Sequence, residues 1–417
     1  MRKIIYIDSE ELHSFLQSAN DEVLGYGYEW ENENVIHLHT KPLLHSFGIA
    51  HTVLFRKGDA CANCETAQDY IVEVNKNNSD ITVNVIGCDE YDINYIPAKN
   101  ELYSRNKGIL ELNILEGKRV MIVGLGSFGS QIAIELAKAG VGNFALFDFD
   151  RVELHNLARH TSTTKDLGRL KTDVLYESIL GKNPYAKVDL FPININEHLD
   201  LMEEEVGKAD IVICGTDNNE SRFNLSTVLV HQQKIGIFGR AVTRAEGGDV
   251  FRYRPGGPCY CCLIGNQWFG QSQEEITSRE QLPAYMSQSD VDANIQVGLS
   301  ADIEPICNMM IKITLMELSR GTNSGISCLE DELVYDYYMW ANRRERRHHN
   351  WAPMPGAGSK PTIMRWYGAH IKRNENCSLC SNSAQMDLDD GGDIIAGYSE
   401  HLKVVDMSDV SLNDLEE

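Results

Sequence analysis

The sequence contains no apolar run near the ~18–20 residues that a membrane-spanning helix needs, so no transmembrane segment is predicted. Its first residues, Met-Arg-Lys-Ile-Ile-Tyr-Ile-Asp-Ser-Glu-Glu-Leu, turn acidic before an apolar segment of signal-peptide length can form. An excess of positive charge is also missing, since 38 Lys and Arg residues stand against 61 Asp and Glu residues. We therefore expect a soluble, cytoplasmic protein that binds neither membranes nor nucleic acid, because its surface would repel a polyanion.

Cysteine is present in an odd number, 11, and is unevenly spread, which argues against a secreted disulfide framework. Six of the cysteines form three Cys-x-x-Cys pairs, at residues 61 and 64, 259 and 262, and 377 and 380. Two such pairs can complete a tetrahedral four-sulfur shell, which favours Zn²⁺ and leaves no position open for water. We predict a structural zinc site formed by Cys259, Cys262, Cys377 and Cys380. The first pair has no matching second pair, so free thiols are expected there.

The sequence pattern divides the chain into three parts. Residues 1–100 alternate short apolar runs with polar stretches, which predicts a small α+β domain with strands near residues 3–8, 35–40, 52–56 and 81–86 and a helix that a capping box at 8–11 opens. Residues 101–384 form the second domain, with insertions near 263–304 and 340–361. Residues 385–417 carry many carboxylates and predict a disordered acidic tail.

The second domain repeats a strand, glycine turn, helix, strand order. Residues 119–123 are a continuous apolar run, as expected of a strand buried on both faces of a parallel sheet. A helix at 130–139 and a strand at 144–147 follow, and a second unit runs through 210–214, a helix from Asn219, and 235–238. An amphipathic helix at 305–318 and late strands near 333–338 and 362–367 complete the domain. We predict an α/β fold with a doubly wound, mostly parallel Rossmann-like sheet.

The sequence Gly-Leu-Gly-Ser-Phe-Gly at residues 124–129 lies between a buried strand and a helix, which is the context that gives a GxGxxG motif its meaning. Gly124 permits a tight turn, Gly126 lets phosphate oxygens reach backbone N–H groups, and Gly129 lets helix and strand approach closely. Asp148, 24 residues beyond Gly124, is placed to accept ribose hydroxyls. This much suits NAD as well as ATP.

A polar cluster downstream of the motif separates these two nucleotides. It comprises Asn156, Arg159, Lys171 and Asp217. Hydride transfer does not need such cations, whereas nucleotidyl transfer must neutralise charge on the α-phosphate and on the leaving pyrophosphate. Asp217, at the end of a parallel strand, can hold Mg²⁺ between phosphates. The alternative for each residue is an ordinary surface ion pair.

In these motifs the sequence resembles the ubiquitin-activating enzymes and their bacterial relatives of the ThiF/MoeB superfamily, which include molybdopterin-synthase and thiamine-biosynthesis adenylyltransferases and the microcin-C peptide adenylyltransferase. The resemblance covers residues 102–382. It implies that Asp148 binds ribose, that Asn156, Arg159 and Lys171 contact phosphates, and that Asp217 is the magnesium-associated aspartate. Arg222 lines the same cleft in this reading. The family usually has Gln after the arginine, where this chain has His160.

The resemblance also implies a quaternary arrangement. Residues 103–106, Tyr-Ser-Arg-Asn, are similar to an upstream arginine motif that reaches the nucleotide of the neighbouring protomer, so Arg105 would act in trans in a homodimer. The first domain would recognise the substrate or brace this dimer.

The implied activity is ATP-dependent adenylation of a C-terminal carboxylate, with Arg159, Lys171, Asp217 and Arg105 as catalytic residues. The expected substrate is a ubiquitin-like protein in a bacterial conjugation pathway, with a conjugating enzyme as a further partner. The alternatives are a short peptide or a sulfur-carrier protein, an inert scaffold subunit, and, more distantly, an NAD-dependent oxidoreductase.

Ubiquitin-activating enzymes pass the acyl group on to a cysteine, and this sequence does not identify one. No cysteine lies between residues 263 and 305. The apolar neighbours of Cys214, Cys307 and Cys328 predict that all three are core residues. A thioester cysteine is therefore not assigned.

Overall fold

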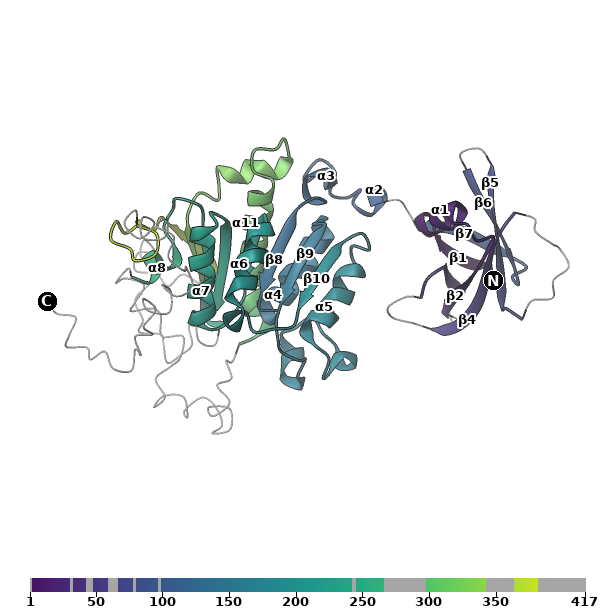
Figure 1. The fold of residues 1–417 in the computed structure, drawn as a ribbon, viewed down its shortest axis with the longest axis horizontal. Coiled ribbons are helices and arrows are strands. Elements are labelled where there is room, and N and C mark those ends of the chain that lie inside the picture. Colours follow the sequence, from purple (N-terminus) through teal and green to yellow (C-terminus); the bar gives the residue numbers. More distant parts are fainter. Residues whose placement is uncertain are drawn as a thin grey trace. The chain divides into compact units, whose positions relative to one another are not determined.

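A computed structural model describes residues 2–30, 33–42, 48–58, 67–77, 80–96, 99–241, 245–265, 298–342 and 364–381. The chain divides into two compact units, Met1–Arg105 and Asn106–Glu417 (Figure 1). Most of the two predicted insertions, the whole predicted tail, Cys61 and Cys64 lie outside the described residues. Within those residues, no helix is both long enough and apolar enough to cross a bilayer.

The first unit is a seven-stranded mixed sheet with helix α1 (Ser9–Gln17) packed against it, as the predicted small α+β domain requires. Its strand order is β6-β5-β4-β2-β3-β1-β7. The strands are β1 (Lys3–Asp8), β2 (Glu22–Trp30), β3 (Val35–His39), β4 (Ile49–Lys57), β5 (Tyr70–Asn77), β6 (Asp80–Ile86) and β7 (Tyr91–Ile96). Leu12 and Phe15 of α1 are buried in the core that these strands form.

Helix α1 begins where the sequence predicts, but the expected capping box is only half formed. Asp8 is the N-cap, and its carboxylate accepts hydrogen bonds from the N–H groups of Glu10 and Glu11. The Glu11 carboxylate accepts from the N–H and hydroxyl of Thr40 instead, at 2.6 and 2.8 Å. Glu11 therefore joins the helix to the end of β3.

The second unit is built on an eight-stranded sheet in the order β10-β9-β8-β11-β12-β13-β14-β15. The first five of these strands are parallel and the last three pair antiparallel. They are β8 (Arg119–Val123), β9 (Asn143–Phe147), β10 (Lys187–Phe191), β11 (Ile211–Cys214), β12 (Ile235–Ala241), β13 (Gly247–Tyr253), β14 (Tyr337–Ala341) and β15 (Arg365–Ala369). The predicted doubly wound, mostly parallel Rossmann-like sheet is confirmed.

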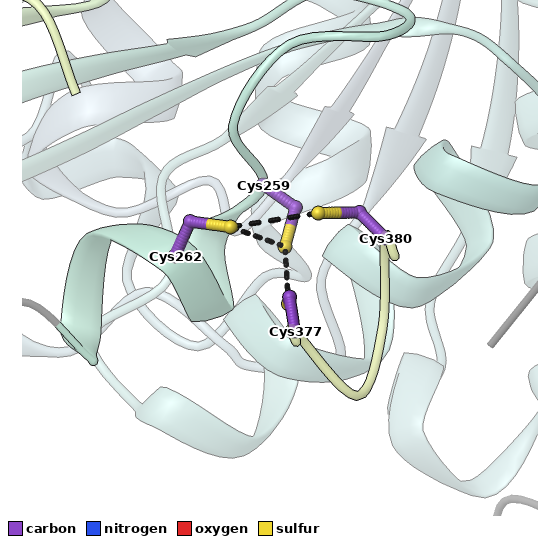
Figure 2. A group of neighbouring side chains, drawn as sticks. All are labelled: Cys259, Cys262, Cys377 and Cys380. Atoms are coloured by element: carbon purple, nitrogen blue, oxygen red, sulfur yellow. Dashed lines mark hydrogen bonds between the residues drawn. The ribbon is translucent and has the colours of Figure 1, made fainter. Parts of the chain in front are cut away.

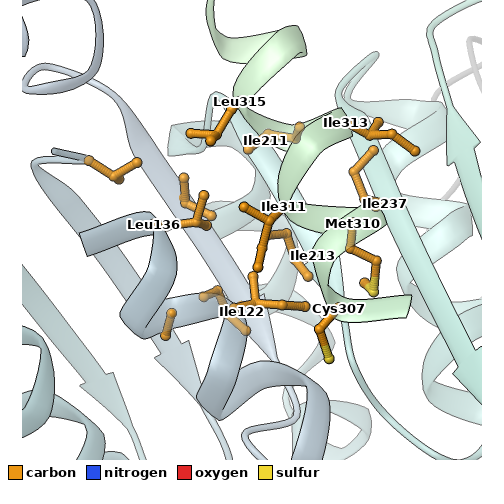
Figure 3. Packing of buried hydrophobic residues seen from close by; sticks show 14 of the residues in the cluster. Ile122, Leu136, Ile211, Ile213, Ile237, Cys307, Met310, Ile311, Ile313 and Leu315 are labelled. Atoms are coloured by element: carbon orange, nitrogen blue, oxygen red, sulfur yellow. The ribbon is translucent and has the colours of Figure 1, made fainter. Parts of the chain in front are cut away.

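Helices cover both faces of this sheet, which explains why its central strands are mostly apolar. Helices α4 (Ser127–Ala139), α5 (Lys171–Leu180) and α11 (Ser300–Leu318) pack on one face, and α6 (Leu199–Lys208) and α7 (Asn219–His231) on the other (Figure 1). On the first face, α11 lies over β11, β12 and β13 and beside α4 (Figure 3). The shorter elements are α2 (Lys99–Leu102), α3 (Leu112–Leu115), α8 (Tyr260–Ile264) and the 3-10 turns at Leu154–Ala158, Thr164–Asp166, Ile195–Glu197 and Gly325–Glu330.

Two late elements differ from the prediction. Helix α11 starts at Ser300 rather than at Pro305, because Ile303 already packs into the core in helical register. Strand β14 starts at Tyr337 rather than near residue 333, because the carbonyls of Leu333 and Tyr335 accept hydrogen bonds from the Arg252 guanidinium. Those carbonyls are therefore not available to a strand ladder.

Candidate functional site

The glycine turn after β8 is shaped by two glycines whose backbones leave no room for a side chain. Gly124 has φ of +83°, and a Cβ there would lie 2.9 Å from the Thr216 nitrogen. A Cβ on Gly129 would lie 2.0 Å from the Gly124 carbonyl oxygen, so only glycine lets α4 approach the turn this closely. Gly126 differs, because a Cβ there meets nothing within 4 Å. It faces an open cavity at the N-terminus of α4.

Asp148, directly after β9, is bound to this turn. Its Oδ2 accepts a hydrogen bond from the Leu125 N–H at 2.6 Å, and its Oδ1 accepts one from the Asp150 N–H at 2.8 Å. Burial raises the pKa of Asp148, and the nearby Lys171 ammonium only partly opposes this. The carboxylate thus connects the ends of two neighbouring strands and also lines the cavity.

Lys171, the first residue of α5, places a buried ammonium beside two carboxylates. Its Nζ lies 2.7 Å from Asp150 Oδ2 and 3.9 Å from Asp148 Oδ2. Both contacts hold the side chain at the wall of the cavity. A phosphate entering the cavity would compete with Asp150 for this cation.

The segment between β9 and α5 brings three further groups to the cavity. Asn156 accepts a hydrogen bond from the Glu153 N–H through its Oδ1 at 2.9 Å, which fixes the 3-10 turn that precedes Arg159. Burial lowers the pKa of Arg159, and the negative charge of Asp217 opposes that effect. Arg159 and Asp217 therefore influence each other although they are 58 positions apart in the chain.

His160 joins the same segment to the glycine turn. Its Nε2 lies 2.7 Å from the Leu125 carbonyl oxygen, and its Nδ1 accepts a hydrogen bond from the Ser162 N–H at 2.9 Å. These contacts require the neutral ring with its proton on Nε2, and burial lowers the pKa of His160 in agreement. Leu125 is therefore held on both sides, through its N–H by Asp148 and through its C=O by His160.

Asp217 lies between β11 and α7, at the carboxyl end of a parallel strand. The next residue, Asn218, is the N-cap of α7 and accepts a hydrogen bond from the Ser221 N–H at 2.8 Å. Arg222, on the first turn of α7, donates to the Thr216 carbonyl at 2.8 Å. Residues on both sides of Asp217 are thereby fixed.

These groups surround one cavity of about 720 Å³ at the carboxyl edge of the parallel strands. The residues selected from the sequence that line it are Gly124, Gly126, Asp148, Asn156, Arg159, Lys171, Asp217 and Arg222. Gly129 lies behind the turn and not in the cavity wall. Arg105 is exposed in the first unit and is not among the residues that line the cavity. Its action in trans stays a prediction.

The sequence did not point to Arg240, a cavity-lining residue at the end of β12. Arg240 lies within an apolar run, Ile-Gly-Ile-Phe-Gly-Arg-Ala, so no periodic pattern distinguishes it. The available signal is a basic residue in β12 and an acidic residue, Asp249, in the adjacent β13, both within mostly apolar strands. Such residues are rarely buried without a partner.

The four predicted zinc ligands come together in the second unit (Figure 2). All four cysteines are buried, and their Sγ atoms lie within 4.8 Å of one another. Three pairs are in contact, Cys259 with Cys262 at 3.8 Å, Cys259 with Cys377 at 3.5 Å, and Cys262 with Cys380 at 3.4 Å. Zn–S bonds of about 2.3 Å in a tetrahedron separate the sulfurs by about 3.8 Å. The four thiols thus fit a Zn²⁺ ion.

Three other cysteines were expected in the core, and Cys214 and Cys307 are buried there. Cys307 is buried among Ile122, Met310 and the other residues of the α11 face (Figure 3). Cys328 is exposed on the 3-10 turn Gly325–Glu330, and its assignment as a core residue is wrong. Its apolar neighbour Ile326 points inward, whereas the turn directs Cys328 to solvent.

The sequence that forms this site matches a known protein family. The model of the ThiF family matches residues 103–322, which is more than half of the chain and includes the glycine turn and every selected cavity residue. The chain belongs to the ThiF family.

Two relatives of this ThiF-family chain show how far the sequence similarity extends. The molybdopterin-synthase adenylyltransferase of Escherichia coli (strain K12) is 34% identical over 160 residues, which are 38% of this chain and 62% of that protein. The adenylyltransferase and sulfurtransferase MOCS3 of Drosophila virilis is 33% identical over 152 residues, 36% of this chain and 33% of that protein. The chain therefore spans less than two thirds of the length of either relative.

Among solved structures, the microcin C7 biosynthetic enzyme MccB in complex with N-formylated MccA is similar, with a TM-score of 0.50 and 20% identity. The match covers 69% of this chain and 77% of that one. At this identity the likeness concerns the fold alone. It agrees with the Rossmann-like architecture of the ThiF-family unit.

Proposed function

We propose that this chain uses ATP to adenylate the C-terminal carboxylate of a protein or peptide substrate. The observation that carries the proposal is the gathering of Arg159, Lys171 and Asp217 around one cavity beside the glycine turn. These residues come from three separate segments of the ThiF-family unit. The adenylyltransferase names of the two relatives support the same activity.

The reaction needs positioning and charge stabilisation rather than a protein nucleophile. A carboxylate oxygen of the substrate attacks the α-phosphorus and forms a new P–O bond. The bond from that phosphorus to the oxygen that bridges the α- and β-phosphates breaks, and pyrophosphate leaves with the electron pair. No proton transfer is required, so the reaction needs no general base.

Most of the cavity residues selected from the sequence have a role in this scheme. Asp148 accepts ribose hydroxyls, and the backbone N–H groups at Gly126 and the N-terminus of α4 bind phosphate oxygens. Lys171 and Arg159 stabilise the charge on the phosphates. Asn156 orients the segment that carries Arg159. Arg105 adds a further cation from a second copy of the chain in a homodimer.

Asp217 supplies hard carboxylate oxygens of the type that Mg²⁺ prefers. When bound, Mg²⁺ would neutralise part of the charge that develops on the phosphates. The carboxylate of Asp217 also interacts electrostatically with the Arg159 guanidinium. A carboxylate without its metal ion would therefore be partly compensated by this arginine.

The four-cysteine cluster suits a structural Zn²⁺ ion, since four thiolates leave no position open for a reacting water. Cys259 and Cys262 follow β13, and Cys377 and Cys380 follow β15. The ion would therefore join the segments that leave these two strands. The cluster is not among the residues that line the cavity. We assign it no part in catalysis.

The favoured substrate is a ubiquitin-like protein of a bacterial conjugation pathway, with a conjugating enzyme downstream. The first unit, Met1–Arg105, exceeds what activation of a small sulfur carrier needs and supports this choice. A sulfur-carrier protein is the alternative that the names of the relatives favour. A short peptide substrate is the third.

The proposal ends at the acyl-adenylate. Burial raises the pKa of the Cys307 thiol to about 12, so at neutral pH it carries almost no thiolate. The same thiol projects from α11 into the hydrophobic core (Figure 3). We therefore do not assign Cys307 as a thioester-forming residue.

Pyrophosphate exchange into ATP tests the proposal. The exchange is measured with candidate ubiquitin-like proteins, sulfur carriers and peptides, and we expect it to depend on one of these substrates. Lys171→Ala and Asp217→Ala should each reduce exchange by at least ~100-fold, because the transition-state charge loses a partner. Lys165→Ala, a surface change outside the cavity, is the matched control. Unchanged exchange in both cavity variants would overturn the site assignment.

A further inference from the structure

Arg240 is a cavity residue that has no role in the proposed adenylation scheme. It follows Gly239 at the carboxyl end of β12, the strand next to β11. β11 leads into Asp217, and both residues line the same cavity. Arg240 itself is only 6% exposed.

A buried network fixes the guanidinium of Arg240. Asp249 lies directly opposite on β13, and its Oδ2 accepts from Arg240 Nε at 3.0 Å and also from a terminal nitrogen. The Tyr337 hydroxyl donates to the same oxygen at 3.0 Å. Burial alone would lower the pKa of Arg240, but the charge and hydrogen bonds of Asp249 raise it overall. The cavity therefore has a permanent, oriented cation in its wall.

The strand order β10-β9-β8-β11-β12 sets the position of this cation relative to the nucleotide. Asp148 follows β9, and Asn194 and Asn196 follow β10, so the nucleoside end of the cavity lies over these strands. The glycine turn follows β8, and the phosphates therefore lie over the centre. Arg240, near the end of β12, lies at the opposite end of this strand order, away from the nucleoside end of the cavity.

The group that must enter at that end is an anion. In an adenylation, a carboxylate approaches the α-phosphate although both carry negative charge. Cations that screen this repulsion lower the barrier. Arginine is suited to the task because its planar N–H groups match a carboxylate or a peptide carbonyl.

Resting on the proposed function, we propose that Arg240 binds the carboxyl terminus of the acyl substrate and orients it for attack on the α-phosphorus. Asp249 and Tyr337 are positioning residues, which hold the guanidinium toward the cavity. The subsite would accept the last residue of an extended chain end, and the ATP subsite is separate from it.

Three ligands distinguish the two subsites in a calorimetric test. ATP with Mg²⁺ reports on the nucleotide subsite. Glycyl-sulfamoyl-adenosine, a stable mimic of an acyl-adenylate, is compared with adenosine sulfamate, which lacks the acyl group. In the natural protein we expect the glycyl group to increase affinity at least about 10-fold, as for a hydrogen bond to a charged group.

Arg240→Gln should abolish this increment while the affinity for ATP changes less than about 3-fold. Arg240→Lys, which keeps the charge but not the planar fork, should retain part of the increment. Tyr337→Phe should reduce it less than Arg240→Gln, since it removes one of the bonds that orient Asp249.

Arg240→Lys also serves if Arg240→Gln does not fold, which the thermal unfolding of each variant reveals. An increment of the natural size in Arg240→Lys and Arg240→Gln would overturn the inference and leave Arg240 a structural link between β12 and β13. The inference would also be overturned if the natural protein bound ATP but gained no affinity from the glycyl group. Failure of the natural protein to bind ATP would instead refute the proposed function.

Discussion

Replacing His160 tests whether the glycine turn is held through the carbonyl of Leu125 as well as through the Leu125 N–H. His160→Ala leaves the Leu125 carbonyl and the Ser162 N–H without their partner, and both residues are buried. A buried polar group without a partner costs about 1–3 kcal/mol. Water from the adjacent cavity can reach part of the gap, so we expect a loss of about 2–4 kcal/mol of unfolding free energy.

Glutamine is the informative comparison. Its amide offers one donor group and one acceptor, the same pair that the neutral His160 ring offers. His160→Gln should therefore lose less than about 1 kcal/mol. At roughly 2–4 °C per kcal/mol, His160→Ala should melt about 4–16 °C lower than the natural protein. Scanning calorimetry, which can separate the transitions of two units, measures the shift.

The pH dependence supplies an independent check. Burial, and then the Lys171 charge, lower the pKa of folded His160 below 6.5, while its bond to Leu125 and the charge of Asp166 oppose them. The unfolded chain thus takes up the proton first, so this contribution to stability is complete above pH 6.5 and is lost as pH falls below it. The loss is at most about 1.4 kcal/mol per pH unit and ceases below the folded pKa. His160→Gln should lack it.

Equal unfolding free energies for His160→Ala and His160→Gln would refute the reasoning, because the ring would then contribute nothing through its two hydrogen bonds. A difference between the natural protein and His160→Gln that did not vary between pH 7 and pH 5 would contradict the buried neutral ring.

Gly129→Ala should destabilise the second unit by several kcal/mol and abolish ATP binding, since its Cβ would overlap the Gly124 carbonyl, whereas Gly117→Ala, where a Cβ meets nothing within 4 Å, should be tolerated. Elemental analysis should find about one zinc ion per chain, and Cys377→Ser should lose it and lower the melting temperature without removing ATP binding from the protein that stays folded. A metal-free natural protein with unchanged stability would contradict this. Cys307→Ala should leave substrate-dependent pyrophosphate exchange within about 2-fold, whereas a loss of ~100-fold would return this thiol to the mechanism.

The cavity was predictable because several of its residues stand where an apolar strand ends and a glycine or polar segment begins. Runs such as residues 120–123 are apolar throughout, and each is followed by a glycine or a polar residue at the strand end. The carboxyl ends of parallel strands lie at one edge of a sheet, so Asp148 and Asp217 could be placed together without coordinates. Membership in the ThiF family was predictable from the same motifs.

Other features depend on contacts that no local pattern contains. Strand β2 was not predicted, because Gly25 and Gly27 weaken its strand pattern. Gly25 is needed there since a Cβ would lie 2.3 Å from the His39 carbonyl. The start of β14 depends on the Arg252 side chain, and Arg240 is recognisable only once Asp249 is known to lie opposite.

The cysteine cluster has a consequence for how the chain length can vary. The two Cys-x-x-Cys pairs are separated by 114 residues, so a bound metal ion closes a long loop. The entropy of closing such a loop grows only logarithmically, by about 0.6 kcal/mol for each doubling of its length. Sequence can thus be added or removed between Cys262 and Cys377, outside α11, β14 and β15, at little entropic penalty, whereas one residue more inside either pair would displace a ligand. We expect homologous chains to differ in the number of residues between the two Cys-x-x-Cys pairs and to agree in the two-residue spacing within each pair.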